Sequence, residues 1–97
     1  MIIKELRDTV TWMTEGDWKQ RFVAEYCQLK IRYQKLRSIN VKFDAGFLDF
    51  TPHCPMDLLR EQQQLMGQLL YIMEKRAVFE NITLPESVLV IDTDPNK

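Results

Sequence analysis

Apolar residues recur at helical spacing along much of this chain, and residues 17–38 are the first long stretch of this kind. There the apolar positions follow one another at intervals of four and three: Phe22, Tyr26, Leu29, Tyr33 and Leu36. This spacing is typical of an amphipathic helix that packs on a second helix. Asp17 and Gln20 have the spacing of a capping box at its start. The pattern therefore predicts a first long helix over residues 17–38.

A second periodic stretch, residues 55–80, carries two adjacent apolar seams. One contains Leu58, Leu65, Leu69, Ile72 and Phe79, and the other contains Leu59, Met66, Leu70, Met73 and Ala77. Two seams make an apolar face wider than one partner helix covers. We expect the N-terminal helix or a neighbouring subunit to cover the remainder. Gly67 costs about 1 kcal/mol relative to alanine inside a helix, and we expect it to mark a close approach of another helix.

The remaining segments complete an all-α fold. Residues 2–13 predict a short N-terminal helix, and residues 39–54 predict an apolar connection that folds back over one end of the helix pair or packs on another subunit. Residues 81–97 predict a tail in which residues 88–91 form a short strand or an extended arm. The whole chain, residues 1–97, is thus predicted to be one domain: an antiparallel helical hairpin with a short N-terminal helix and a short extended or strand-like C-terminal tail, forming a homo-oligomer.

Charge is distributed unevenly along the chain, although the net charge is only −1. Residues 18–42 carry seven basic residues and one acidic residue, and the segments on both sides are acidic. One interpretation is attraction between the helices, with each exposed pair contributing about 0.3–0.5 kcal/mol. The other is an anion-binding surface, for which Arg32 and Lys35 are candidates. We expect no duplex nucleic acid as a partner, because the overall charge is acidic.

Aromatic residues are interleaved with these bases and have two interpretations. Aromatic faces stack nucleic-acid bases, so Trp18, Tyr26 and Tyr33 suit a nucleotide site. Tyr26 and Tyr33 also lie on the predicted seam, where they suit the helix core. Uninterrupted apolar runs such as residues 88–91 are much shorter than the roughly 20 residues that span a membrane, so we expect no membrane partner.

The chain lacks the side-chain sets that catalysis and metal binding require. Its one histidine, His53, adjoins Cys54 in the predicted connection, with no third group to orient them. One histidine with Cys27 and Cys54 does not supply the roughly four ligands of a zinc site, and both thiols are expected to be reduced. The two glycine-rich phosphate-binding motifs, GxxxxGK[ST] and GxGxxG, are both absent from the sequence. We therefore expect no enzyme activity, no catalytic residue, no metal site and no cofactor.

Two runs of residues, taken in order, resemble a known family. They extend from Trp18 through Tyr26 and Tyr33 to Leu36, and from Leu48 through Phe50-Thr51-Pro52 and Cys54-Pro55 to Arg76. Over residues 17–84 the chain is similar to small helical-hairpin proteins of tailed bacteriophages, including crAss-like phages. Some members of that family are anti-CBASS proteins. These oligomerise, typically as hexamers, and sequester the cyclic oligonucleotides of bacterial immunity without cleaving them.

The resemblance implies a counter-defence protein in the cytoplasm of the infected bacterial host, with a cyclic oligonucleotide bound between protomers. By the resemblance, Tyr26 matches a tyrosine that contacts the base, and Lys42 matches a lysine that contacts phosphate. Arg60, near the start of the second predicted helix, is a candidate contact for a larger cyclic ligand. Asp44 stands where the family has a hydroxyl group, and its negative charge would repel a phosphate.

Two other functions are compatible with the residues. One is a protein-binding module or inhibitor that docks on a host or phage protein through the apolar residues 43–50 or 88–91. The other is a structural dimer without a ligand, for which replacing Arg32 and Lys35 by glutamine changes only salt sensitivity.

Overall fold

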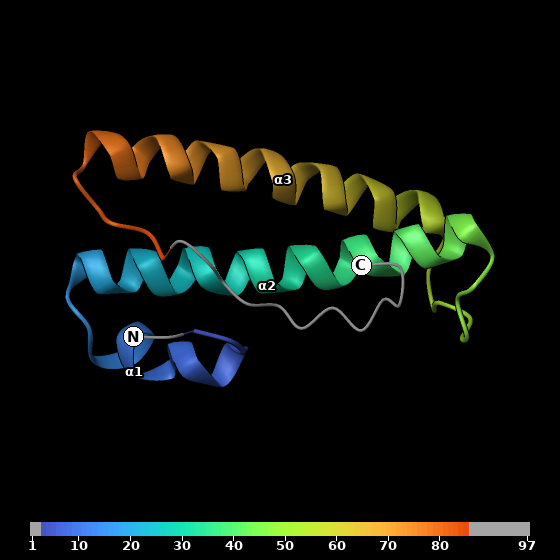
Figure 1. Ribbon diagram of the computed structural model, residues 1–97, viewed down its shortest axis with the longest axis horizontal. Coiled ribbons are helices and arrows are strands. Elements are labelled where there is room, and N and C mark those ends of the chain that lie inside the picture. The colour runs from blue at the N-terminus through green and yellow to red at the C-terminus, as the bar shows by residue number, and fades with distance from the viewer. Residues whose placement is uncertain (1–2, 86–97) are drawn as a thin grey trace.

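The computed structural model describes residues 3–85, which form an all-helical fold, so the predicted all-α class is confirmed. The helices are a 3-10 helix, η1 (Leu6–Thr9), followed by α1 (Val10–Glu15), α2 (Trp18–Ala45) and α3 (Met56–Phe79). α2 and α3 lie side by side with opposite chain directions, and η1 and α1 lie against the other side of α2 (Figure 1). α2 is therefore the central element. The strand predicted at residues 88–91 lies outside the described residues.

α2 begins as the sequence predicts. The Asp17 carboxylate accepts the backbone N–H of Gln20 at 2.8 Å, and the Gln20 side chain accepts the backbone N–H of Asp17 at 3.0 Å. This capping box satisfies two of the N–H groups that a helix start leaves unpaired. Of the five predicted seam residues, four are buried: Phe22, Tyr26, Leu29 and Leu36. The fifth, Tyr33, is half-buried.

The predicted end of this helix at residue 38 is wrong, because α2 continues to Ala45. Asn40 lies buried between α2 and α3, where its Nδ2 donates to Oε1 of Gln63 at 2.7 Å. This polar pair replaces an apolar contact in the helix interface, so it interrupts the apolar periodicity without interrupting the helix. The sequence pattern consequently ended before the helix did.

The helix stops at Gly46, which has a left-handed φ of 81° that glycine adopts without steric cost. The N–H of Phe47 then donates back to the last turn at 2.8 Å. The connection is therefore residues 46–55 instead of the predicted 39–54. It does not fold back over the core, since Phe47 is 77% exposed and Phe50 is 53% exposed.

α3 matches its predicted range of 55–80 to within one residue at each end, and its two apolar seams have different surroundings. The inner seam packs on α2 and consists of Leu59, Met66, Leu70, Met73 and Ala77, all of them buried or half-buried. The outer seam is exposed and consists of Leu58, Leu65, Leu69, Ile72 and Phe79. A Cβ at Gly67 would lie 3.2 Å from a ring carbon of Tyr33, so the expected close approach of a helix is confirmed.

The N-terminal segment does not form the predicted helix over residues 2–13. The Asp8 carboxylate accepts the backbone N–H groups of Lys4 at 2.9 Å and of Glu5 at 3.1 Å. Glu5 is extended, and the first helical residue is Leu6. These bonds hold the pKa of Asp8 below its usual value. The local acidic cap thus delays the start of helical structure relative to the apolar pattern.

The core-facing side of this segment also differs from the apolar stripe on which its prediction rests, namely Ile3, Leu6, Val10 and Met13. Ile3 is fully buried as expected, but Leu6 and Val10 are exposed. Thr9 fills the buried position, and its Oγ1 accepts a hydrogen bond from Nε2 of Gln28 on α2 at 2.7 Å. Threonine is not counted among the apolar positions, so the apolar spacing assigned the wrong side of this segment to the core.

Candidate functional site

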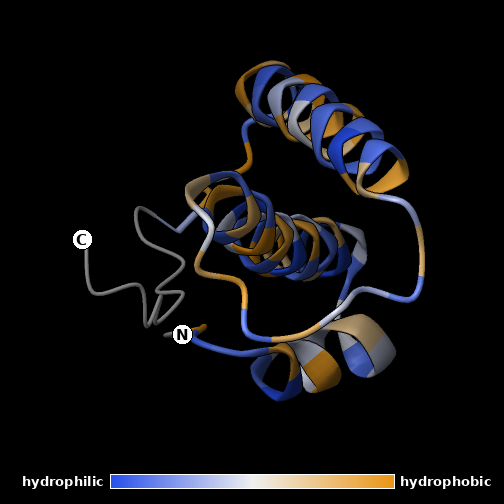
Figure 2. Ribbon diagram, turned by 90° about the vertical axis from the view of Figure 1, so that its right-hand side faces the viewer, coloured by the Kyte–Doolittle hydropathy of each residue, from blue (hydrophilic) through white to orange (hydrophobic). Residues whose placement is uncertain are grey.

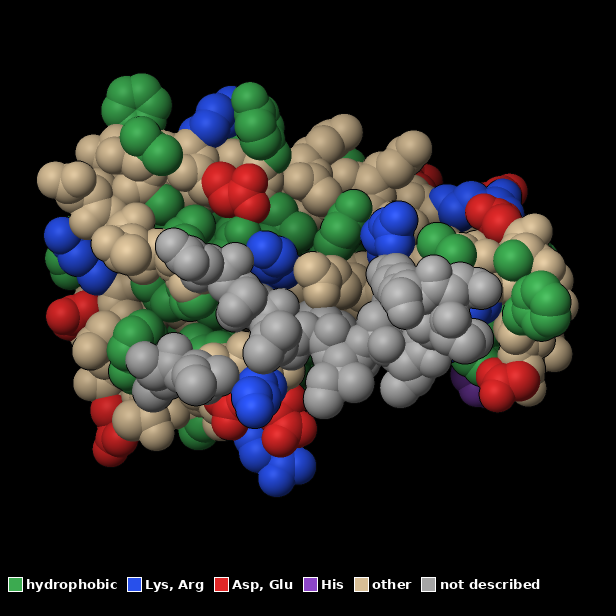
Figure 3. Space-filling model, viewed as in Figure 1, with side chains coloured by type: hydrophobic (Ala, Val, Ile, Leu, Met, Phe, Trp, Pro, Cys, Tyr) green, Lys and Arg blue, Asp and Glu red, His purple; other side chains and the backbone are tan. Residues whose placement is uncertain are grey.

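The bases of α2 lie along two flanks of that helix. Residues spaced by seven or eleven return to nearly the same side of a helix. Lys19, Lys30 and Arg37 therefore share one flank, while Arg21 and Arg32 share another. All five are exposed except Lys30, which is half-buried. On the face that Figure 3 shows, basic side chains are accordingly scattered among acidic and hydrophobic ones and form no single patch.

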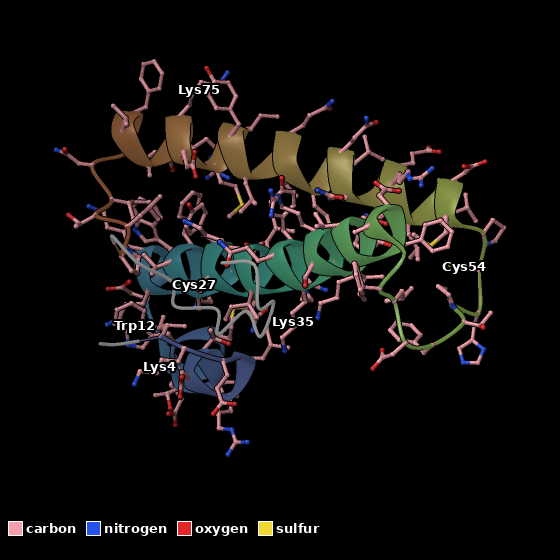
Figure 4. All side chains as sticks on the ribbon, turned by 45° about the vertical axis from the view of Figure 1, so that its right-hand side comes forward. Lys4, Trp12, Cys27, Lys35, Cys54 and Lys75 are labelled. Atoms are coloured by element: carbon pink, nitrogen blue, oxygen red, sulfur yellow. The ribbon has the colours of Figure 1, made fainter. Side chains whose placement is uncertain are left out.

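Three of the predicted ligand-binding residues, Arg32, Lys35 and Lys42, lie on the surface of α2. Arg32 and Lys35 are exposed and Lys42 is half-buried, and none of the three has an ion pair within residues 3–85. Lys35 projects from the side of α2 away from α3 (Figure 4). Lys42 follows one heptad later on that side, roughly 10 Å further along the helix axis. These two ammonium groups are available to an anionic ligand.

Tyr26 is placed differently from what the resemblance implies. It is only 3% exposed, and its hydroxyl donates to Oε2 of Glu74 at 2.6 Å across the α2–α3 interface. Burial and the neighbouring carboxylate raise the pKa of its phenol. A base cannot stack on a ring enclosed in this way within a single chain. Tyr26 also lies roughly 24 Å along the helix from Lys42, so one protomer does not bring the two together.

Arg60 lies near two carboxylates, one on α2 before the connection and one on α3 after it. Its Nη2 lies 2.6 Å from Oδ1 of Asp44, and its Nη1 lies 3.9 Å from Oδ1 of Asp57. The guanidinium carbon is also 5.9 Å from the centre of the Phe43 ring. The sequence identified Arg60 and Asp44 separately and missed their pairing. Because Arg60 offsets the charge of Asp44, the carboxylate repels a phosphate less strongly than its position alone indicates.

A hollow that the sequence did not indicate lies at the other end of α2. It has a volume of about 340 Å³, and its walls include Ile3, Trp12, Lys19, Val23, Ile82 and Leu84. Trp12, half-buried and labelled in Figure 4, supplies an aromatic face, and Lys19 supplies a cation. The only sequence signal for it is a tryptophan adjoining the N-terminal apolar stripe. A flat ring bearing a negative charge matches this chemistry.

The two cysteines are free thiols with different surroundings. Cys27 is fully buried, and burial raises the pKa of its thiol to about 11, whereas Cys54 is exposed in the connection. Within residues 3–85, no three His, Cys, Asp or Glu side chains gather to hold a metal ion. In the same range, no helix has the length and apolar character needed to cross a bilayer.

Fold and surface together define a small all-helical protein whose central helix carries exposed cationic flanks and whose last helix carries an exposed apolar seam. The family model described as Sequestin matches residues 16–79, more than half of the chain, and the chain belongs to this family. The match takes in α2, the connection and α3, and leaves η1 and α1 outside. Neither the curated proteins nor the solved structures searched gave a match.

Proposed function

We propose that this chain is a phage counter-defence protein that binds cyclic oligonucleotide immune signals and sequesters them without cleaving them. It acts in the cytoplasm of the infected bacterial host, as an anti-CBASS protein. The observation that carries the proposal is a set of bases on α2 that have no ion pair within residues 3–85, the exposed Arg32 and Lys35 and the half-buried Lys42, in a chain whose family name denotes sequestration. Binding without chemistry requires neither a metal nor a cofactor.

The surface chemistry fits an anion with several phosphates. Each nucleotide of a cyclic oligonucleotide contributes one negative phosphodiester group, and Arg and Lys form charge-assisted hydrogen bonds with such groups. Lys35 and Lys42 project from one side of α2, and Arg32 lies on the adjacent flank. Arg60 contributes at the end of the helix pair, where Asp44 already holds part of its guanidinium.

Self-association is part of the same proposal. The bases are divided between two flanks of α2, so one protomer presents only a few of them to a compact ligand. A homo-oligomer, with a hexamer as the state that the family resemblance implies, brings bases from neighbouring protomers around one nucleotide. This arrangement also explains how a ligand could be enclosed by a chain whose predicted stacking residue, Tyr26, is buried.

Isothermal titration against a panel of cyclic dinucleotides and trinucleotides tests the proposal. We expect saturable heat with at least one nucleotide, and chromatography of the heat-denatured complex should recover that nucleotide intact. The double variant Arg32→Gln/Lys35→Gln should weaken binding by about tenfold or more, since one lost charge-assisted contact is worth about 1.5 kcal/mol.

The matched control is Lys4→Gln/Arg7→Gln, which removes the same charge from exposed side chains of the N-terminal segment. It should bind as the wild type does. Equal losses in both variants would mean that only net charge matters, and recovery of a linear product would replace sequestration by hydrolysis.

A second candidate function is a protein-binding module that docks on a host or phage protein. The exposed rings of Phe47 and Phe50 favour it, because large apolar side chains at a loop surface are typical of protein interfaces. For this function, Phe47→Ser/Phe50→Ser abolishes capture of a stoichiometric partner from infected cells, and the wild-type protein releases no heat with any nucleotide.

A further inference from the structure

The hollow at the start of α2 is bounded by three segments that are far apart in the sequence. Figure 2 looks along α2 and shows α3 on one side of it and the N-terminal helices on the other. After α3 the chain returns to α2 (orange in Figure 1). Ile3 and Trp12 line the hollow from the N-terminal segment, Lys19 lines it from α2, and residues 81–85 line it from the chain after α3. A ligand in the hollow would therefore contact all three segments.

Most of these walls lie outside the part of the chain that the family model matches. The match covers residues 16–79, so the N-terminal wall and residues 81–85 are additional to it. Lys19 precedes Lys35 by 16 residues on α2, which separates them by roughly 24 Å along the helix axis. The hollow is thus distinct from the bases that we propose to bind a cyclic oligonucleotide.

The walls of the hollow are mostly apolar and carry one charge. Val23 and Ile82 are buried. Trp12 and Leu84, which are half-buried, add an aromatic ring and an aliphatic side chain. Among the described residues that line the hollow, Lys19 is the only charged one. The lining therefore favours a ligand with an apolar body and a single negative charge.

Lys19 is available to that negative charge. It is exposed and has no ion pair within residues 3–85. Its ammonium lies 5.5 Å from the centre of the Trp18 ring, a cation–π contact that does not neutralise its charge. The carboxylate of Asp17 accepts the backbone N–H of Gln20 and does not line the hollow.

The size of the hollow limits the ligand to a small molecule. Its volume of about 340 Å³ is near the lower end of the range of roughly 300–1,000 Å³ that is typical of ligand pockets. One or two fused rings fit in this space. A cyclic dinucleotide, with two bases, two sugars and two phosphates, is too large for it.

We infer that this hollow binds a small aromatic monocarboxylate, with the ring against Trp12 and the apolar walls and the carboxylate paired with Lys19. Contacts between aromatic rings are more favourable than their buried area alone. A hydrogen bond between an ammonium and a carboxylate is roughly twice as strong as one between neutral groups. The inference goes beyond nucleotide binding and does not depend on it.

NMR titration with indole-3-carboxylate tests the site. In a Trp18→Phe background Trp12 is the one remaining tryptophan, so a single indole N–H resonance reports on the hollow. This resonance should shift and saturate with a Kd of roughly 0.1–1 mM, as expected for a ligand of about twelve non-hydrogen atoms. A resonance that stays in place up to about 10 mM ligand would overturn the inference.

Two lysine variants test the charge. Lys19→Gln should weaken binding of indole-3-carboxylate by about tenfold, because it removes the charge-assisted contact. Lys75→Gln is the matched control, since it removes the same charge from an exposed lysine of α3 that does not line the hollow. It should bind as the wild type does, and equal weakening in both variants would contradict the role of Lys19.

A blocking variant tests the location. Leu84→Trp fills the hollow and should leave the far-ultraviolet circular dichroism helical. Because a ligand that binds only the folded state stabilises it, indole-3-carboxylate should raise the Tm of the wild-type protein. It should leave the Tm of Leu84→Trp unchanged. An equal rise in both proteins would place the ligand elsewhere and contradict the inference.

Two further ligands separate the contributions of charge and ring. The neutral indole-3-carboxamide should bind the wild-type protein about tenfold more weakly than the carboxylate, and Lys19→Gln should bind the two with similar affinity. Hexanoate keeps the carboxylate without the ring and should bind at least about tenfold more weakly. Equal binding of the carboxylate and the amide by the wild-type protein, or equal binding of hexanoate, would contradict the proposed ligand class.

Competition separates this site from the proposed nucleotide site. Cyclic oligonucleotides should not displace indole-3-carboxylate, and displacement would contradict a separate site. Calorimetry with nucleotides measures the proposed function independently, so either proposal can fail while the other stands.

Discussion

The two seams of α3 have similar residues and similar spacing, yet opposite environments. The inner seam packs on α2 and includes the buried Leu70, Met73 and Ala77, while every residue of the outer seam is at least 47% exposed. The comparison shows that apolar spacing predicts a helical partner without saying which molecule supplies it. Inner-seam residues determine whether the chain folds, and outer-seam residues determine which molecules the folded chain can contact.

The largest expected difference between the seams is in folding stability. Leu70→Ala on the inner seam should lower the free energy of unfolding by about 2–5 kcal/mol, because it opens a cavity in a closed core. Leu69→Ala, its neighbour on the outer seam, should cost less than about 0.5 kcal/mol in dilute, dissociated protein. Urea denaturation measures both. Equal losses would contradict the distinction between the seams.

A smaller difference is expected for two tyrosines. Tyr26→Phe removes the hydrogen bond to Glu74 in the helix interface and should cost about 1 kcal/mol, because Glu74 remains largely solvated. Tyr71→Phe, at an exposed position of α3, should leave stability unchanged. Neither substitution should alter nucleotide affinity. A Tyr26→Phe variant that folds normally but loses binding would restore the ligand role that the family resemblance implies.

An effect of similar size is expected from pH. The pKa of the Cys27 thiol rises from 9.0 to about 11 on burial, so its contribution to stability is complete below pH 9 and is lost as the pH rises toward 11. Tyr26 acts in the same direction, because its pKa is also raised. Urea denaturation at pH 8 and pH 10 should therefore show lower stability at the higher pH. Unchanged stability would contradict the burial of both groups.

Thiol labelling at pH 8 checks this burial directly. The exposed Cys54 should react with a disulfide reagent at once, whereas Cys27 should react only after denaturation. Fast labelling of both thiols in the native protein would mean that the α2 core opens readily.

Much of the helical framework could be predicted because it follows from local chemistry. The capping box of Asp17 and Gln20 and the α2 seam gave the start of α2, and the double seam gave α3 almost to the residue. The late end of α2 could not be predicted, since a buried Asn40 pairs with Gln63, which is distant in the chain. The late start at Leu6 depends on Asp8 binding backbone N–H groups, which an apolar pattern does not detect.

The candidate site was predictable only as a set of charges. The excess of bases in α2 is a property of composition, so Arg32, Lys35 and Lys42 could be selected without a structure. The hydrogen bond from Tyr26 to Glu74 and the pairing of Arg60 with Asp44 each join residues far apart in sequence. Such contacts depend on how α3 lies against α2, and the periodicity of one helix carries no information about them.

Calorimetric titration of the wild-type protein with cyclic oligonucleotides, followed by recovery of the nucleotide, tests sequestration most directly. We predict saturable binding, release of the intact cyclic nucleotide on denaturation, and binding weakened by about tenfold or more in Arg32→Gln/Lys35→Gln but unchanged in Lys4→Gln/Arg7→Gln. No heat and no thermal shift with any cyclic oligonucleotide would contradict it.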